Sequence, residues 1–188
     1  MPNPIRLLGI SGSLRRPSLN SALLRAALGV LPEGVVLATH DLRSVPLFDG
    51  DVEQVGYPVS VVELREAIRA ADGVLFVTPE YNYSYPGVLK NALDWVSRGK
   101  DQPLRRKPVA VAGASPSGFG TVRAQLALRQ VFLALDARDL QRPELHVANA
   151  AGLFSPQGEL TDEATREKLR ALLSAFVEMV RSPLVLAE

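Results

Sequence analysis

The segment PEYNYSYPGVLKNALDW, residues 79–95, contains three of the four tyrosines of the chain within five positions. Turns are built mainly from proline, glycine and asparagine, so a cluster of polar aromatic side chains needs another explanation. Tyrosine offers a flat apolar ring with a polar tip, which suits the face or edge of a heteroaromatic ring. We therefore expect residues 80–85 to line a site for a flat, partly polar ligand, with backbone amides around Asn82 bonding its polar edge. A tyrosine-rich interface loop without a ligand is the alternative.

A second unusual segment, SGSLRRPSLNS at residues 11–21, lies just before a predicted helix. It carries the hydroxyls of Ser11, Ser13, Ser18 and Ser21, the amide of Asn20, and the guanidinium groups of Arg15 and Arg16. Free backbone N–H groups and the helix dipole favour an anion at such a position. Many neutral donors with one or two arginines suit a terminal phosphate monoester. The alternative is an ordinary loop in which Ser18 or Asn20 only caps the helix.

The third candidate loop is GASPSGFGT, residues 113–121. Ser115, Ser117, Gly118 and Gly120 make a narrow, donor-rich loop that would let a ligand approach the backbone closely. Glycine–serine loops are common, so this loop indicates a ligand site only because it is expected to lie beside the other two.

Several competing chemistries are excluded by motif. The run from Gly9 to Ser13 fits neither the G-x-G-x-x-G dinucleotide fingerprint nor the G-x-S-x-G nucleophile elbow, and no G-x-x-x-x-G-K-[ST] phosphate loop is present. The chain has no cysteine, which excludes disulfides and thiolate chemistry. The two histidines, His40 and His146, lack metal-type spacing, so we expect no metal site.

Short apolar runs alternate with helical patterns along the whole chain. We predict strands at 5–10, 35–40, 73–78 and 109–113 and within 140–147, and helices at 21–31, 59–71, 87–97, 119–137 and 162–180. Strands that are apolar throughout indicate a sheet covered on both faces. Five such repeats predict a flavodoxin-like, doubly wound five-stranded parallel sheet of order 2-1-3-4-5, with helices on both faces. In that order the three loops meet at the carboxyl ends of the strands, where ligands bind.

Composition adds the broad class. With 188 residues we expect one domain, 1–188, and a net charge of +1 gives no reason to expect nucleic acid or an acidic membrane as partner. Residues 98–107, RGKDQPLRRK, are interpreted as a solvated connection between helix and strand. The start of the chain is broken by glycine too early for a signal peptide and no run is long enough to span a bilayer, so we expect a cytoplasmic protein.

The predicted helix at 119–137 is apolar nearly all round, whereas a surface helix shows a single apolar stripe. We expect an interface between copies of the chain there, within a homo-oligomer. A helix with an unusually apolar exposed edge is the alternative.

The segments GSLRRPSLNSALLRAA, PEYNYSYPGVLKNALDW and GASPSGFGTVRAQLALRQVF together resemble the NADPH-dependent FMN reductase family, which includes chromate, quinone and azo-dye reductases. The resemblance covers nearly the whole chain and implies a flavodoxin-like fold, non-covalently bound FMN, and dimers or tetramers. It places Ser13, Arg15, Ser18, Asn20 and Ser21 around the FMN phosphate and Ser115 and Gly118 on the far side. It places along the isoalloxazine ring Pro79, Glu80, Tyr81, Asn82, Tyr83 and Ser84.

The chain departs from the family pattern at Pro17, where a glycine or small residue is usual, and at Tyr85, where a smaller apolar residue is usual. These departures leave the role of Arg16 open, and Tyr85 could narrow the mouth of the site or reach an oligomer partner.

The resemblance implies an enzyme in which NAD(P)H passes hydride to N5 of FMN, and a quinone, azo compound, free flavin or oxidised metal such as chromate then takes the electrons. No residue is expected to act as an indispensable acid or base, because the cofactor carries the chemistry. There are two alternatives. One is a flavodoxin-type electron carrier without NAD(P)H activity, and the other is a flavin-free sensor or scaffold. The sequence does not distinguish NADPH from NADH.

Overall fold

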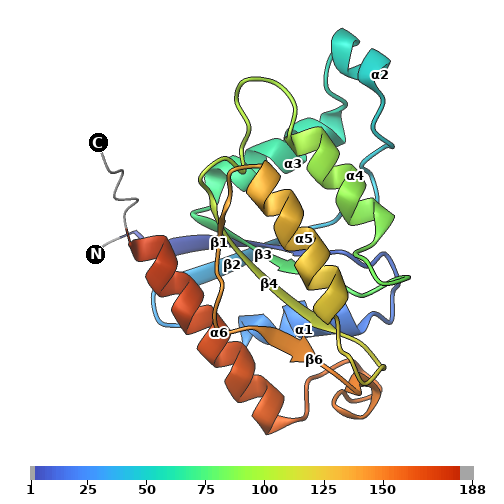
Figure 1. Ribbon diagram of the computed structural model, residues 1–188. Coiled ribbons are helices and arrows are strands. Elements are labelled where there is room, and N and C mark those ends of the chain that lie inside the picture. Colours follow the sequence, from blue (N-terminus) through green and yellow to red (C-terminus); the bar gives the residue numbers. More distant parts are fainter. Residues whose placement is uncertain (1–2, 183–188) are drawn as a thin grey trace.

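A computed structural model, which describes residues 3–182, contains one parallel sheet with helices around it (Figure 1). The strands are β1 (Ile5–Ser11), β2 (Val35–His40), β3 (Gly73–Val77), β4 (Pro108–Ala114), β5 (Arg138–Asp139) and β6 (Leu145–Val147). The helices are α1 (Leu19–Leu28), α2 (Gly50–Val55), α3 (Val59–Ala70), α4 (Gly87–Val96), α5 (Val122–Ala134) and α6 (Glu163–Arg181), with a 3₁₀ turn at Ala150–Gly152. None of the helices within residues 3–182 is long and apolar enough to span a membrane.

The sheet has the order β2-β1-β3-β4-β5, with β6 also paired to β4, and every pairing is parallel. The predicted order 2-1-3-4-5 is therefore confirmed. All residues of β3 and β4 are buried, as their apolar sequences predict. Helices α1 and α6 cover one face of the sheet, and α3, α4 and α5 cover the other (Figure 1).

The fifth strand is the main departure from the sequence prediction. Its place is shared by two short strands, because β5 pairs with the start of β4 and β6 pairs with its end. Only β6 lies within the predicted range 140–147, and Pro143, which has no N–H to donate to a ladder, lies between the two. The sheet therefore has six strands, and its fifth position is divided.

Helix boundaries differ from the prediction for reasons of capping. Helix α1 begins at Leu19, two residues earlier than predicted, because the Ser18 hydroxyl accepts a hydrogen bond from the Ser21 N–H, and it ends before Gly29. Helix α5 is shorter at both ends than the predicted 119–137. Helix α2 lies between the predicted strand at 35–40 and the predicted helix at 59–71, where the sequence indicates no element. It has no buried residue and so no apolar periodicity that could have revealed it.

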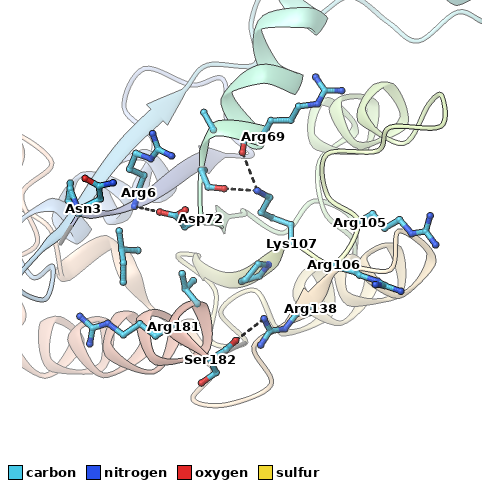
Figure 2. A pocket seen from close by; sticks show the side chains of 16 residues that line it. Asn3, Arg6, Arg69, Asp72, Arg105, Arg106, Lys107, Arg138, Arg181 and Ser182 are labelled. Atoms are coloured by element: carbon cyan, nitrogen blue, oxygen red, sulfur yellow. Dashed lines mark hydrogen bonds between the residues drawn. The ribbon is translucent and has the colours of Figure 1, made fainter. Parts of the chain in front are cut away.

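Helices run opposite to the strands in this fold, so α3, α4 and α6 end at the amino edge of the sheet, and cations cap each end. The Lys107 ammonium donates to the carbonyls of Arg69 and Ala71 at 3.3 and 2.6 Å, at the end of α3 (Figure 2). The Arg138 guanidinium donates to the carbonyls of Met179 and Ser182 at the end of α6. These contacts satisfy carbonyls that have no partner within a helix and oppose the negative end of its dipole.

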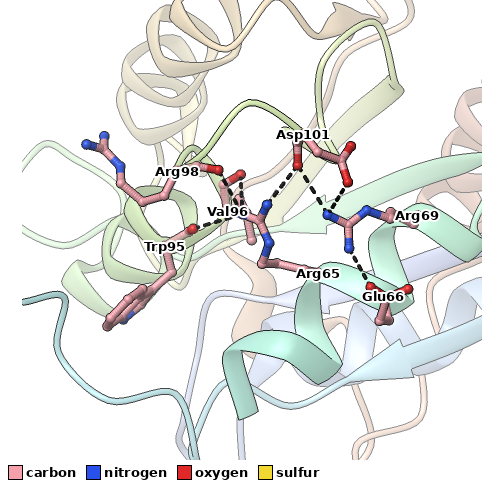
Figure 3. Close-up of polar contacts among 7 residues, drawn as sticks. All are labelled: Arg65, Glu66, Arg69, Trp95, Val96, Arg98 and Asp101. Atoms are coloured by element: carbon pink, nitrogen blue, oxygen red, sulfur yellow. Dashed lines mark hydrogen bonds and ion pairs between the residues drawn. The ribbon is translucent and has the colours of Figure 1, made fainter. Parts of the chain in front are cut away.

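Arg65 caps α4 and is itself buried, with 4% of its surface exposed. Its guanidinium donates to four carbonyls, those of Trp95, Val96, Arg98 and Asp101, at 2.7 to 3.3 Å (Figure 3). The segment 98–107 is thus a connection between helix and strand, as predicted, but it is anchored rather than merely solvated, because Leu104 is also buried.

Candidate functional site

A cavity of about 310 Å³ lies at the carboxyl edge of the sheet, between the loops that follow β1, β3 and β4. All three loops singled out from the sequence contribute to it. It is lined by Ser13, Arg15, Pro17, Ser18, Leu19, Asn20, Pro79, Glu80, Tyr81, Ala114, Ser115 and Pro116. Eight of the thirteen predicted site residues are in this set, which places the predicted phosphate loop and the start of the tyrosine loop opposite each other.

The loop after β1 presents donors at the start of α1. Ser13 and Ser18 are buried, whereas Arg15 is exposed and its guanidinium has no carboxylate partner among the described residues. Ser18 is the N-cap of α1, and the N–H groups of Leu19 and Asn20 open the helix, where no intrahelical acceptor exists. Hydroxyls, free N–H groups and one guanidinium therefore converge on one end of the cavity.

Asn20 lines the cavity, but its side chain is fully engaged. Its amide nitrogen donates to the Ala114 carbonyl at 2.9 Å, and its amide oxygen accepts from the Ala114 N–H at 2.8 Å. The side chain thereby fastens the start of α1 to the end of β4. These two hydrogen bonds to the backbone fix the spacing between the first and third loops.

The tyrosine loop forms a tight turn. The N–H and C=O groups of Tyr81 and Ser84 pair with each other at 2.8 and 3.0 Å, and both central residues have positive φ, 50° at Asn82 and 69° at Tyr83. This is the pattern of a type I′ turn, in which asparagine is common but tyrosine is strained. Because the pairing uses only the outer residues, the N–H groups of Asn82 and Tyr83 lie outside the turn's own hydrogen bonds.

Glu80 links the tyrosine loop to α5. Its carboxylate, 6% exposed, accepts hydrogen bonds from the N–H groups of Arg123 and Ala124 at 3.0 and 3.2 Å, and it forms an ion pair with the Arg123 guanidinium. A carboxylate at this position caps the helix and complements its dipole. The Arg123 guanidinium in turn lies 3.9 Å from the centre of the Tyr83 ring and 5.0 Å from that of Phe119. One ion pair therefore fixes the second loop against the third.

The third loop depends on a glycine at the end of β4. A Cβ added to Gly113 would lie 2.1 Å from the Thr121 hydroxyl and 2.4 Å from the Thr78 carbonyl, so no other residue fits. Ser115, 9% exposed, lines the cavity, and its hydroxyl contacts Ser117. Gly118 lies further along the loop, outside the lining of the cavity.

The remaining predicted residues point elsewhere. The Ser21 hydroxyl contacts that of Ser11 at 3.0 Å and lines a neighbouring cavity of about 200 Å³. Ser84 and Tyr85 line a groove of about 630 Å³ between α4 and α5, where burial raises the pKa of the Tyr85 phenol. Tyr83 is 73% exposed, and Arg16 is exposed and outside the cavity lining.

Sequence reasoning missed Arg123 and Phe119. A signal was available for Arg123, because a cation in the first turn of a helix opposes the dipole and needs an acidic partner. The partner, Glu80, is 43 residues away, so only the fold could identify it.

The donor set fits the terminal phosphate and flat ring that the sequence predicts. Ser13, Ser18, Arg15 and the start of α1 provide only donors toward an anion, and the one carboxylate lining the cavity, Glu80, is neutralised by Arg123. On the other side, the turn leaves the N–H groups of Asn82 and Tyr83 outside its own hydrogen bonds, and two such donors suit the polar edge of a flat ring.

Comparisons with known proteins agree with this geometry. Residues 5–152 match the model of the family described as NADPH-dependent FMN reductase. The chain is 48% identical over 181 residues to an NAD(P)H-dependent FMN reductase of Pseudomonas aeruginosa, covering 96% of this chain and 98% of that protein. It is 41% identical over 184 residues to a quinone reductase of Escherichia coli K12, again covering 96% and 98%.

A solved structure extends the likeness to the fold. FerB, a flavoenzyme NAD(P)H:(acceptor) oxidoreductase from Paracoccus denitrificans, superposes with a TM-score of 0.84 at 34% identity, covering 94% of this chain and 97% of that one.

Proposed function

The chain belongs to the NADPH-dependent FMN reductase family, and we propose that it passes hydride equivalents from NAD(P)H to quinones and related small oxidants. It is an oxidoreductase that uses FMN and NAD(P)H. The observation that carries the proposal is the convergence of the three predicted loops on one cavity at the carboxyl edge of the sheet. When bound, FMN supplies the redox chemistry, accepting hydride and passing electrons on.

The first loop would hold the FMN phosphate. Ser13 and Ser18 donate their hydroxyls, the exposed Arg15 closes over the anion from outside, and the N–H groups at the start of α1 complete the donor set. Asn20 contributes its N–H while its side chain keeps Ala114 in place. Ser21 supports this loop through Ser11.

The second and third loops would hold the flavin ring. Pro79 and Tyr81 line the cavity directly, and the N–H groups of Asn82 and Tyr83 donate to the polar edge of the ring. Glu80 acts by fixing the turn against α5, and Ser84 closes the turn. Ser115 and Gly118 border the ring on the far side.

Quinones, azo compounds, free flavins and oxidised metals such as chromate are the proposed electron acceptors. No acidic side chain in the cavity lining is positioned to select one of them, since Glu80, the only carboxylate there, is engaged by Arg123. Selection would rest on the shape of the mouth, where Tyr81 and Tyr83 are exposed.

The test is a visible spectrum of the purified protein, followed by anaerobic addition of NADPH or NADH. Rapid bleaching of the flavin bands is expected, and the faster donor identifies the preferred coenzyme. Benzoquinone, an azo dye, chromate and free FMN are then supplied in turn, and reoxidation of the flavin ranks them. Protein stripped of FMN serves as the control, since it should oxidise no NAD(P)H.

Two outcomes would count against the proposal. A yellow protein that neither donor bleaches, and that forms a stable semiquinone on titration, would be an electron carrier of the flavodoxin type. A colourless protein that does not take up added FMN would have no flavin function at all.

The proposed assembly is a homodimer or homotetramer formed through α5. Leu126 and Leu133 on this helix are 54% and 83% exposed, and Phe119 just before it is 69% exposed. The groove between α4 and α5, which Tyr85 lines, has one of its walls formed by this helix. Light scattering should give a multiple of the chain mass, and Leu133→Glu should shift it to the monomer. A monomeric wild-type protein would contradict the assembly.

The single-domain organisation over 1–188 and the cytoplasmic location belong to the same proposal. Limited proteolysis that leaves the 20.3 kDa chain whole would support the first, and cell fractionation tests the second.

A further inference from the structure

A second cavity, of about 940 Å³, lies at the amino edge of the sheet. It is bordered by the starts of β1 and β4, the end of α3 and the end of α6 (Figure 2). Strand β1 has seven residues, so this cavity is about 20 Å from the flavin site, given a rise of about 3.3 Å per residue. It cannot be part of that site.

The wall of this cavity is strongly cationic. Seven cationic side chains line it, and Asp72 is the single acid in the lining. The cations are Arg6, Arg69, Arg105, Arg106, Lys107, Arg138 and Arg181. They come from separate parts of the chain whose net charge is only +1, so the fold concentrates positive charge at this edge.

Some of these cations have structural partners. Lys107 and Arg138 cap the ends of α3 and α6, Arg69 pairs with Glu66 and Asp101, and Arg181 pairs with Glu178. Helix capping and surface ion pairs therefore explain four of the seven.

Three cations remain. Arg105 and Arg106 share one carboxylate, that of Asp136, at 3.5 and 3.8 Å. The Arg6 guanidinium has no ion pair among residues 3–182, because Asp72 accepts instead from the Arg6 backbone N–H at 2.7 Å. Burial lowers the pKa of Lys107, and the charge of Arg6 acts in the same direction, which Asp72 opposes. An excess of like charge around a hollow is relieved by a bound anion.

We propose that this cavity binds a small organic polyphosphate, of the class of nucleoside di- or triphosphates. Guanidinium groups match phosphate oxygens in fork geometry, and several of them suit more than one phosphate. The volume falls in the range of about 300–1,000 Å³ typical of sites for organic ligands and far exceeds that of a lone phosphate ion. Ile5, Pro108 and Val180 supply an apolar wall for the organic part.

The test is calorimetric titration of ATP into the FMN-saturated protein at low ionic strength, so that the flavin site is filled. The variant is Arg6→Gln with Arg105→Gln, because both side chains are exposed and neither caps a helix. We expect ATP to bind the wild-type protein, and to bind the double variant at least ~10-fold more weakly through loss of two phosphate contacts. AMP, with one phosphate, should bind the wild-type protein ~10-fold more weakly than ATP.

The matched control is Lys168→Gln with Arg170→Gln, which removes the same charge from α6 outside the cavity. This control should bind ATP within about twofold of the wild-type protein, since screened surface charges act weakly at a distance. Basal NAD(P)H oxidation should be unchanged in both double variants.

Four binding results would overturn the proposal. They are no ATP binding to the wild-type protein, equal binding in wild type and Arg6/Arg105 variant, equal affinity for AMP and ATP, or binding of a single-stranded oligonucleotide without binding of ATP. A rise of the KM for NADPH in the Arg6/Arg105 variant alone would also overturn it, because the site would then serve the coenzyme.

Discussion

The two edges of the sheet have opposite electrostatic character, for the same structural reason. At the carboxyl edge, α1 and α5 begin, and their free N–H groups face Ser18 and the Glu80 carboxylate. At the amino edge, α3, α4 and α6 end, and their carbonyls accept from Lys107, Arg65 and Arg138. Helix direction thus determines which side chains each edge needs.

The two edges also differ in how many of their polar groups are already engaged by other groups of the chain. At the carboxyl edge the helix start of α1 keeps free donors beside a cavity, which is the condition for holding an anion. At the amino edge most cations already satisfy carbonyls or acids of the chain. Substitutions at the carboxyl edge should therefore alter FMN binding, and substitutions of the engaged cations at the amino edge should alter stability.

The largest effect should come from the amino edge. Arg65→Met keeps an unbranched apolar stem but leaves four carbonyls without their donor. The free energy of unfolding should fall by about 3 kcal/mol, from the lost charged hydrogen bonds and the lost cap of α4. Urea unfolding measures this, with exposed Arg170→Met as control. The contrast between the edges fails if FMN affinity falls while stability does not.

Glu80→Gln tests a residue that should affect both stability and FMN binding. The buried carboxylate is lost, while Arg123, 33% exposed, keeps its charge near the helix start. We expect a loss of about 2 kcal/mol in stability, below the range for fully buried pairs, together with weaker retention of FMN. Unfolding and flavin release by filtration measure the two. Glu167→Gln, on the exposed face of α6, is the control. Unchanged flavin release would show that Glu80 acts on stability alone.

Arg15→Ala should alter the carboxyl edge only. Removing one charged contact to a phosphate should weaken FMN binding about 10-fold, or about 1.4 kcal/mol. Stability of the FMN-free protein should not change, because Arg15 is exposed and its guanidinium forms no ion pair among the described residues. Flavin fluorescence on titration gives the affinity. Arg16→Ala, also exposed but outside the cavity lining, is the neighbouring control. Equal effects of the two substitutions would remove the assigned role of Arg15.

The smallest effect concerns pH. His40, at the end of β2, has its pKa lowered by burial, against the opposing charges of Glu63 and Asp41. The unfolded chain therefore binds a proton on His40 that the folded chain does not, as the pH falls below about 6.5. Stability should decline as the pH falls through this window, and His40→Asn should make the decline shallower. Thermal unfolding between pH 5 and pH 8 measures it. An unchanged slope would exclude His40 as the cause.

The sequence predicts the sheet order and the three loops because each is encoded locally. Apolar runs identify β3 and β4, and loop composition identifies the segments that line the cavity. What could not be predicted depends on residues brought together from afar. Three sets of contacts join partners that are 30 to 94 residues apart in the sequence. They are the Glu80–Arg123 ion pair, the two hydrogen bonds between Asn20 and Ala114, and the bonds from Arg65 to four carbonyls.

Two local features also escaped prediction. Helix α2 is held by its Asp49 cap and has no buried face, so periodicity could not reveal it. The division of the fifth strand into β5 and β6 occurs across Pro143, within a segment too short to show a pattern.

The tight turn at Tyr81–Ser84 has a consequence for the kinetics of ligand uptake. Fixing the backbone of one residue costs about 1–2 kcal/mol in conformational entropy, and this loop has already lost that freedom on folding. Ligand affinity is therefore not reduced by the entropic cost of ordering this loop on binding. A site that is shaped before its ligand arrives fills at a rate set by encounter rather than by loop closure.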